Sequence, residues 1–297
     1  MTRSFVAPTT VDEALAALAD GARPVAGGTD LVVGARQGKA ALPDALLAIH
    51  RIDELRGISQ LPDGGLRLGT LTTHEEIVTH PAVLRWFTAL ADASAIVGSH
   101  ATRAQGTIGG NVMNASPAMD TGGPLLCFDA SVTLRSTRGE REVPLDELWT
   151  GPGSTSAARD ELLVAIDMPA PAPGNGSCYV RLEYRRQMEI AVVGATVVVT
   201  LDGGSMTDAR IAITALSPTI RRVPEAERAL VDSGDVDEAA KLTATASSPI
   251  DDVRGSANYR RAMAEVIARR AIAAAIARAK GERIPMPASP ALQGATL

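Results

Sequence analysis

Cysteine is scarce in this chain of 297 residues, and the two that occur, Cys127 and Cys178, stand far apart. An iron–sulfur cluster held by four thiolates needs more cysteines than that, so this chain alone holds no such cluster. Neither cysteine belongs to a C-x-x-C pair or to a Cys/His ligand spacing, which argues against a structural zinc site. We therefore expect no metal ligands, and we interpret Cys127 as a small buried apolar residue.

Signatures of catalysis by side chains are also absent. The four histidines do not form an H-E-x-x-H motif, and the sequence contains neither a G-x-S-x-G nucleophile elbow nor a P-loop. We expect no catalytic side chain, which means that a bound cofactor would supply any chemistry.

Long apolar runs and an excess of positive charge are absent as well. Apolar stretches fall short of the roughly 20 residues that a membrane span needs, and residues 1–10 lack the charged-then-apolar order of a secretory signal. The formal net charge of -5 gives no electrostatic reason to expect a nucleic acid or an anionic membrane as partner. These features predict a cytoplasmic protein with no membrane span.

Glycine, by contrast, is concentrated in two informative places. The first glycine segment, residues 26–31, reads Ala-Gly-Gly-Thr-Asp-Leu, and the second glycine segment, residues 106–111, reads Gly-Thr-Ile-Gly-Gly-Asn. Adjacent glycines permit positive φ and the close approach of a ligand, so backbone N–H groups can bind phosphate oxygens without lysine or arginine. Each segment alone is also typical of a plain turn, and neither has the G-x-G-x-x-G pattern of a Rossmann dinucleotide site.

Polar side chains accompany both glycine segments. Thr29, Thr107 and Asn111 add donors for phosphate oxygens. Asp30 and Asp120 add carboxylates suited to ribose or adenine donors, although capping of the segment that follows is a second, less favoured interpretation of Asp30. The two segments together predict the two walls of one diphosphate site.

The apolar pattern predicts an α+β protein. A helix is expected over 11–18, with Thr9 or Thr10 as its N-cap. Further helices are expected over 75–77, 81–97, 224–231, 236–245 and 258–279, and strands over 24–26, 42–49, 66–69, 130–134, 142–143, 178–184, 191–201 and 209–216. The Pro/Gly/Ser-rich stretch 169–177 is the expected linker, and Asp202-Gly203-Gly204 the expected hairpin turn.

Three ordered motifs resemble one known family. The two glycine segments and the run Ala-Ser-Pro-Ala-Met-Asp at 115–120 are similar to the FAD-binding medium subunit of the molybdenum hydroxylases, the family of xanthine dehydrogenase and aerobic carbon monoxide dehydrogenase. The resemblance extends over residues 72–74, 161–163, 185–191 and 259–261. It therefore covers nearly the whole chain.

The resemblance implies a fold in two domains. A two-subdomain FAD-binding domain of the vanillyl-alcohol-oxidase/PCMH type is expected over residues 1–175, with subdomains at about 1–56 and 57–175. A C-terminal domain of a three-stranded antiparallel sheet with helices is expected over 176–297.

The resemblance also implies a set of FAD-binding residues. In such proteins the two glycine segments wrap the diphosphate, Asp120 matches an aspartate that contacts the flavin nucleotide, and Ile190 lies in the loop beside the isoalloxazine ring. Arg181 stands where many relatives carry lysine, which is not an equivalent cation. The residues implied to bind FAD are Val25, Ala26, Gly27, Gly28, Thr29, Asp30, Leu31, Val97, Thr107, Ile108, Gly109, Gly110, Asn111, Asp120, Leu163, Arg181 and Ile190.

The function that the resemblance implies is electron transfer. The chain would join a small iron–sulfur subunit and a large molybdopterin subunit, in a dimer of heterotrimers, and pass electrons through FAD to an external acceptor such as NAD, a quinone or oxygen. Iron–sulfur clusters and molybdopterin are expected only in the partner subunits. Two alternatives stay open: a self-contained FAD-dependent oxidoreductase, and a non-redox nucleotide-binding assembly module.

Two features have more than one interpretation. His74 is either a packing histidine or a flavin ligand or proton donor. Arg185 and Arg186 are either surface charge or a device that steers an anionic acceptor.

Overall fold

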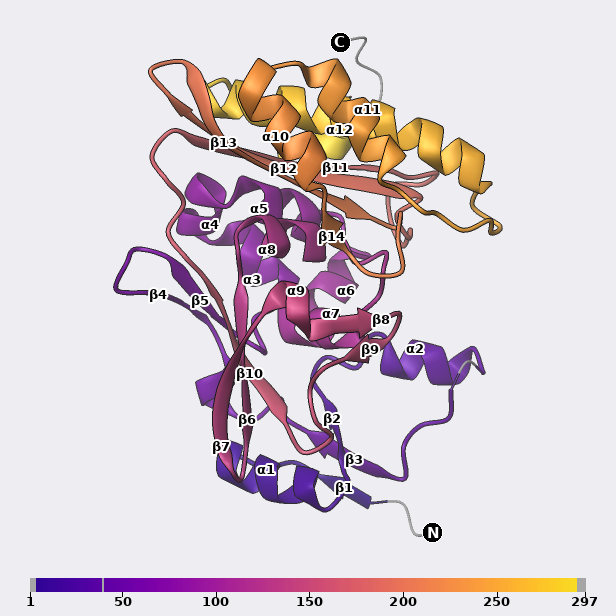
Figure 1. Cartoon of the computed structure of the whole chain (residues 1–297). Coiled ribbons are helices and arrows are strands. Elements are labelled where there is room, and N and C mark those ends of the chain that lie inside the picture. Colours follow the sequence, from indigo (N-terminus) through magenta and orange to yellow (C-terminus); the bar gives the residue numbers. More distant parts are fainter. Residues whose placement is uncertain (1–3, 39, 293–297) are drawn as a thin grey trace.

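The structure, a computed structural model, describes residues 4–38 and 40–292. A small N-terminal layer, a central region of strands and short helices, and a C-terminal sheet covered by helices follow one another along the molecule (Figure 1).

The N-terminal layer is a parallel three-stranded sheet with one helix on it. Its elements are β1 Ser4–Val6, α1 Val11–Ala19, β2 Arg23–Val25, α2 Leu31–Arg36 and β3 Ala45–Ala48, in the strand order β1-β3-β2. The expected cap of α1 is Thr10, whose side chain accepts a hydrogen bond from the N–H of Glu13. Helix α2 buries none of its residues and extends away from the body (Figure 1).

The central region contains a five-stranded antiparallel sheet in the order β4-β5-β10-β6-β7. Its strands are β4 Ile58–Gln60, β5 Leu66–Gly69, β6 Ser131–Ser136, β7 Gly139–Pro144 and β10 Leu162–Met168. The 3-10 helix η1 Asp53–Leu55 precedes this sheet, and α9 Leu145–Leu148, β8 Trp149–Gly151 and β9 Ser154–Thr155 lie between β7 and β10.

Short helices pack between this sheet and the C-terminal layer. They are α3 His74–Thr79, α4 Pro81–Trp86, α5 Thr88–Ala95, α6 His100–Gln105, α7 Ile108–Asn114 and α8 Gly122–Cys127. The single helix expected over 81–97 is wrong, because the backbone of Phe87 leaves helical geometry (φ -124°, ψ 47°). The buried Phe87 ring packs edge-on against Phe128, with 4.9 Å between ring centroids. Packing there overrides the local helical pattern.

The C-terminal layer is an antiparallel sheet in the order β11-β12-β13-β14. The three expected strands form, the hairpin at Gly203 and Gly204 has positive φ at both glycines, and a two-residue strand extends the sheet. The elements are β11 Asn175–Leu182, β12 Val193–Asp202, β13 Ser205–Thr214, β14 Arg221–Arg222, α10 Pro224–Ser233, α11 Val236–Thr245, α12 Ala257–Ala279 and α13 Ala288–Leu292.

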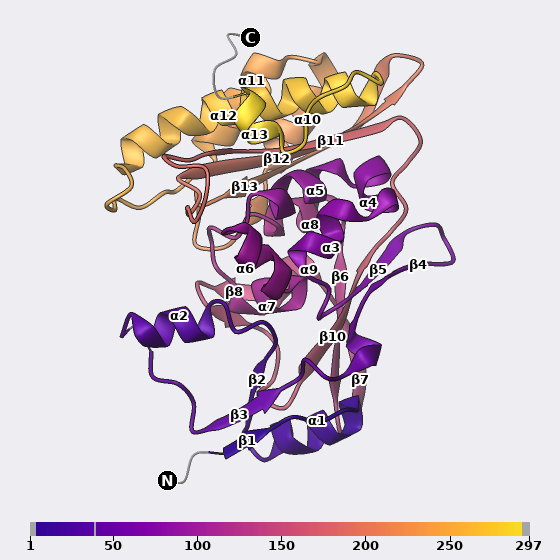
Figure 2. The ribbon, with the colours of Figure 1, turned by 180° about the vertical axis from the view of Figure 1, so that it is seen from behind.

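Both faces of the C-terminal sheet are covered. Helices α10 and α12 pack on one face, and α5 and α8 of the central region pack on the other (Figure 1, Figure 2). Tyr179, Val198 and Ala212 consequently belong to the same hydrophobic core as the central helices. Covering on both faces explains why β12 is a nearly continuous apolar run rather than an alternating one.

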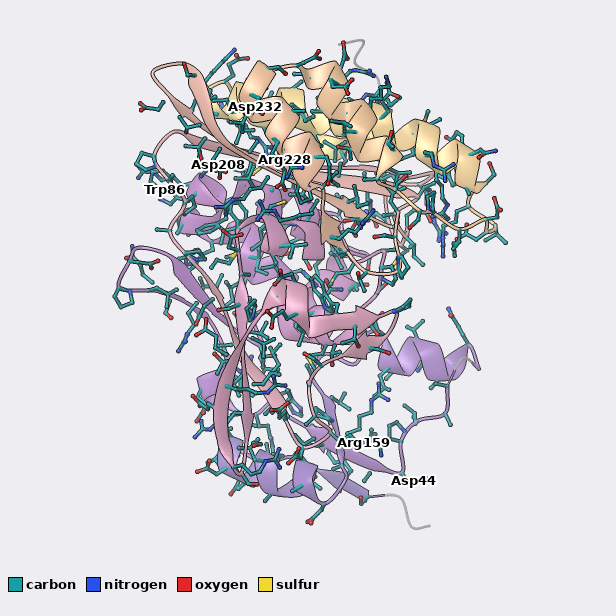
Figure 3. All side chains as sticks on the ribbon, viewed as in Figure 1. Asp44, Trp86, Arg159, Asp208, Arg228 and Asp232 are labelled. Atoms are coloured by element: carbon teal, nitrogen blue, oxygen red, sulfur yellow. The ribbon has the colours of Figure 1, made fainter. Side chains whose placement is uncertain are left out.

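Charged side chains lie on the outside at both ends of the molecule. Figure 3 shows Asp44 near the N-terminal layer and Asp232 over the C-terminal helices. Among the residues that the structure describes, no helix is both long enough and apolar enough to span a membrane.

Candidate nucleotide-binding site

The two glycine segments lie against each other, although almost eighty residues separate them. A Cβ on Gly27 would stand 1.8 Å from the carbonyl oxygen of Gln105, and a Cβ on Gly106 would stand 3.5 Å from Thr29 Oγ1. The first distance is impossible for a real side chain, so only glycine permits this contact at position 27.

The first glycine segment presents a run of unused backbone donors. None of the N–H groups of residues 27–31 donates a hydrogen bond to an acceptor among the described residues, and the first one used is that of Val32, which binds Gly28 O at 2.9 Å. Gly28 has φ 68°, the left-handed conformation that the sequence suggested. Consecutive unpaired N–H groups around a left-handed glycine form a concavity suited to an anion.

The second glycine segment differs from expectation. The prediction of a positive-φ turn is wrong there, because Gly109 and Gly110 lie in the first turn of α7 and Thr107 caps that helix. The N–H groups of residues 108–111 bind the chain's own oxygens, namely Thr72 O, Thr70 O, Thr107 Oγ1 and Thr107 O. This segment therefore offers a ligand its surface and side chains, whereas the first segment offers backbone donors.

The two glycines of α7 are required for different reasons. A Cβ on Gly109 would stand 1.7 Å from Thr70 Oγ1, whereas a Cβ on Gly110 would meet only Thr107 Oγ1 at 3.0 Å and Ala26 Cβ at 4.0 Å. Gly110 is also exposed and Gly109 is buried. Packing against Thr70 therefore requires glycine at position 109. Gly110, which has no side chain, leaves the surface next to the first glycine segment open to a ligand.

The third motif, residues 115–120, leads into the same place. Asn111 Oδ1 accepts a hydrogen bond from Thr121 Oγ1 at 2.6 Å, which leaves the Asn111 amide hydrogens as donors. Asp120 accepts from the Tyr179 hydroxyl at 2.6 Å and from the Arg181 guanidinium at 2.7 Å. The carboxylate of Asp120 is therefore held by β11 through both of its oxygens.

Arg181, expected beside the cofactor, is fully buried and pairs with Asp120 and Glu183. Burial by itself would lower the pKa of Arg181, but the carboxylates of Asp120 and Glu183 outweigh it and raise that pKa. Leu163 is likewise buried, in β10 opposite Leu134, so its side chain serves the core.

The loop that contains Ile190 reaches the segment after α5. The Met188 N–H donates to Gly98 O at 2.9 Å, and Thr102 Oγ1 donates to Met188 Sδ at 3.6 Å. Ile190 is 45% exposed, and Val97 is half-buried on the facing segment. The bond between Met188 and Gly98 thus brings the loop of Ile190 close to the segment of Val97, and both residues belong to the set implied to bind FAD.

The neighbouring arginines of this loop are not equivalent. Arg185 donates to Met188 O at 2.7 Å and pairs with Glu189 at 3.2 Å, so both of these contacts lie within its own loop. Arg186 is exposed and makes no ion pair among the described residues. Of the two, only Arg186 is available to attract an anion.

His74 lies beside Gly106 of the second glycine segment, and Asp30 belongs to the first glycine segment. His74 is buried, and burial followed by the nearby positive charge of Arg103 lowers its pKa to about 4, so its ring is neutral at pH 7. Its Nδ1 is buried without a hydrogen-bond partner among the described residues. The pKa of Asp30 is raised because neighbouring chain displaces water from its carboxyl group, and its side chain does not cap α2.

The described residues contain no cluster of histidine, cysteine and carboxylate side chains that would hold a metal ion. Cys127 and Cys178 are free and buried, and burial raises the pKa of both thiols. The interpretation of Cys127 as a buried apolar residue is confirmed.

These features fit a nucleotide that is held by its diphosphate. The first glycine segment has unused donors for an anion, the surface at Gly110 is open, and the Asn111 amide supplies a further donor. The α+β fold and this site together are typical of a protein that binds a phosphate-containing cofactor without a Rossmann motif.

Comparison with known proteins identifies the family. Residues 1–171 match the family described as the FAD binding domain in molybdopterin dehydrogenase, and residues 179–275 match the CO dehydrogenase flavoprotein C-terminal domain. The chain belongs to this family of FAD-binding oxidoreductase subunits, as the motifs predicted.

Relatives match over nearly their full length. The chain is 31% identical over 288 residues to a xanthine dehydrogenase FAD-binding subunit of Escherichia coli O157:H7, covering 94% of this chain and 98% of the relative. It is 32% identical to the carbon monoxide dehydrogenase medium chain of Hydrogenophaga pseudoflava, covering 92% and 97%. A solved structure of carbon monoxide dehydrogenase from that organism superposes with a TM-score of 0.89, covering 94% of this chain and 98% of that one. The predicted fold class and the predicted cofactor, FAD, are confirmed.

Proposed function

We propose that this chain is the FAD-binding electron-transfer subunit of a molybdenum hydroxylase complex. The observation that carries the proposal is the run of N–H groups at residues 27–31 that find no acceptor among the described residues, next to Ala26 and the open surface at Gly110, in a chain of this family. Bound FAD supplies the redox chemistry, and the chain binds and orients it.

Each predicted site residue has a place in this proposal. The first glycine segment would hold the diphosphate, with Gly110 and the Asn111 amide beside it. Val97 and Ile190 would flank the ring, while Asp120, Arg181 and Leu163 would act mainly by fixing the surrounding backbone. The remaining members of the set, Val25, Ala26, Gly27, Gly28, Thr29, Asp30, Leu31, Thr107, Ile108 and Gly109, shape the two walls. The domain boundaries proposed with it are 1–175, divided near residue 56, and 176–297.

The proposed partners are a small iron–sulfur subunit and a large molybdopterin subunit. Support comes from relatives whose names mark them as parts of complexes, such as a 6-hydroxypseudooxynicotine dehydrogenase complex subunit of Paenarthrobacter nicotinovorans, 33% identical to this chain. We propose a heterohexamer, a dimer of heterotrimers, that passes electrons to an external acceptor, and we keep the cytoplasmic location as a prediction for cell fractionation to test.

The two alternatives are not favoured. Family matches extend over both the N-terminal and the C-terminal parts of the chain. A self-contained oxidoreductase needs its own substrate domain, and a non-redox module has no use for a flavin site.

Affinity purification of the tagged chain from its own cells tests the proposal. We expect a yellow complex with the absorbance bands of flavin, in which mass spectrometry identifies an iron–sulfur chain and a molybdopterin chain. A colourless protein that takes up no added FAD would contradict the proposal.

A further inference from the structure

Arg103 is a buried positive charge without a carboxylate partner. Among the described residues three arginines are buried, namely Arg103, Arg181 and Arg260. Arg181 pairs with Asp120 and Glu183, and Arg260 pairs with Asp252. Arg103, which is 7% exposed, makes no ion pair in the part of the chain that the structure describes.

The hydrogen bonds of Arg103 give its charge no carboxylate partner among the described residues. One nitrogen of its guanidinium donates to Val97 O at 3.2 Å, and another donates to His100 Nδ1 at 3.0 Å. Neither acceptor is a carboxylate, and Nε donates to no acceptor among the described residues. The carboxylate of Glu75 is close enough to act on the pKa of Arg103 but is beyond ion-pair distance. Because a charge without an ion-pair partner is costly to bury, this position favours the binding of an anion.

The helix that carries Arg103 connects the two ends of the proposed flavin site. At its C-terminal end, Gln105 O lies where only a glycine at position 27 permits contact. At its N-terminal end, Thr102 contacts Met188 of the loop that contains Ile190. Arg103 therefore lies on α6 between the diphosphate segment and the loop expected beside the ring.

We propose that Arg103 is the cation of the flavin site, whose guanidinium stabilises an anionic group of bound FAD. This inference rests on the proposed function. FAD offers two sources of that anion, the diphosphate and the ring, which gains negative charge when it is reduced. Arg103 becomes electrostatically paired only when FAD binds, and it complements a first glycine segment that contains no basic side chain.

The test uses the full chain as wild type, Arg103→Met and Arg103→Lys, with FAD and ADP as probes. ADP carries a diphosphate and lacks the ring. If Arg103 binds the diphosphate, Arg103→Met lowers the affinity for both FAD and ADP by tenfold to a hundredfold, about 1.4 to 2.8 kcal/mol of binding free energy. Arg103→Lys then recovers part of this affinity. If it acts on the reduced ring, Arg103→Met keeps its affinity for both probes and the midpoint potential of bound FAD falls.

Thermal unfolding separates a cofactor role from a structural one. Because Arg103 makes no ion pair among the described residues, removing its charge should leave the FAD-free protein as stable as wild type or more stable, while the rise in Tm on adding FAD shrinks. The opposite outcome for Arg103→Met is a lower Tm without FAD, an unchanged rise in Tm on adding FAD and an unchanged midpoint potential of bound FAD. It would mean that Arg103 only fixes the backbone at Val97, and it would overturn the inference. Arg138→Met, which removes an exposed partner of Asp160, is the matched control and should change neither binding nor potential. If wild type itself binds no FAD, the proposed function fails before the question of Arg103 arises.

Discussion

Gly109 and Gly110 are neighbours in the first turn of α7, yet their surroundings differ. Thr70 Oγ1 occupies the place of a Cβ on Gly109, whereas Gly110 faces the exposed surface beside Ala26. The glycine pair in the sequence predicts a ligand site but does not tell which glycine the fold needs. That distinction comes from Thr70, which is distant in sequence.

Gly110→Val should abolish FAD retention while the chain stays folded. The added side chain occupies the surface that the diphosphate must approach, and replacing a glycine inside a helix removes its entropic penalty of about 0.5 to 1 kcal/mol. Flavin absorbance of the purified protein and urea unfolding measure the two effects. Gly109→Ala is the contrast, with a loss of stability of about 1 to 3 kcal/mol or more from overpacking. Normal flavin content in Gly110→Val would refute the assignment of this surface.

His74 should make the free energy of unfolding depend on pH. Its pKa falls from 6.5 to about 4 on folding, so below pH 6.5 the unfolded chain binds a proton that the folded chain does not. The free energy of unfolding is therefore highest, as far as His74 is concerned, above the pKa of the unfolded chain. It falls as the pH is lowered, by about 2 kcal/mol at about pH 5. Urea unfolding of wild type and His74→Gln at pH 7 and about pH 5 measures it. The variant should lose less stability on acidification, and His50→Gln, at an exposed position, should behave as wild type. Equal losses in all three proteins would be incompatible with a buried neutral His74.

Strand β11 is the element that joins the central helices to the C-terminal layer. Its Tyr179 N–H donates to Asp92 of α5, and its Arg181 binds Asp120 before α8. Asp92 also pairs with Arg278 of α12 at 2.6 Å, deep in the protein. From the sequence we expected a strand at 178–184 and a linker at 169–177, whereas β11 begins at Asn175. The prolines and glycines near residue 170 gave no sign of the long-range hydrogen bonds and ion pairs that hold this part of the chain.

Breaking the pair between Asp92 and Arg278 should destabilise both layers together. Arg278→Met leaves the Asp92 carboxylate buried and unpaired, which costs about 3 to 5 kcal/mol. The double variant Asp92→Asn/Arg278→Met should recover part of this loss, because the amide still accepts from the N–H groups of Tyr179 and Ala288. Urea unfolding followed by circular dichroism provides the comparison. A single variant as stable as wild type would show that the pair does not hold the layers together.

Elements with local signals were predictable, and those set by packing were not. Thr10, Asp235 and Ser256 cap helices close to their expected starts. The break at Phe87 was not predictable, because it depends on packing against Phe128. Helix α6 and Arg103 were missed for a similar reason: one more arginine in an arginine-rich chain gives no sign that it will be buried without an ion pair to any described residue.

At the scale of the whole molecule, the C-terminal sheet packs between two helical layers, one of which belongs to the central region. The motifs that resemble the family occur in both parts of the chain, so the sequence predicted a single FAD subunit over its whole length. Substrate chemistry would belong to a partner.

The purified chain, loaded with FAD, should oxidise no purine, aldehyde or aromatic acid. Its flavin should nevertheless be reduced by dithionite and reoxidised by an artificial acceptor, because electron transfer needs only the cofactor. Absorbance spectroscopy follows both steps. Turnover of an organic substrate by this chain alone would overturn the subunit assignment.

The unequal use of backbone donors in the two glycine segments has a consequence for amide hydrogen exchange. Without FAD, water must satisfy the N–H groups of residues 27–31, so these amides should exchange rapidly, while those of residues 108–111 are slowed by bonds within the chain. Adding FAD should slow the first group strongly and the second only slightly. Deuterium uptake measured by mass spectrometry would then show the cofactor site as one segment that becomes protected on binding beside another that was protected from the start.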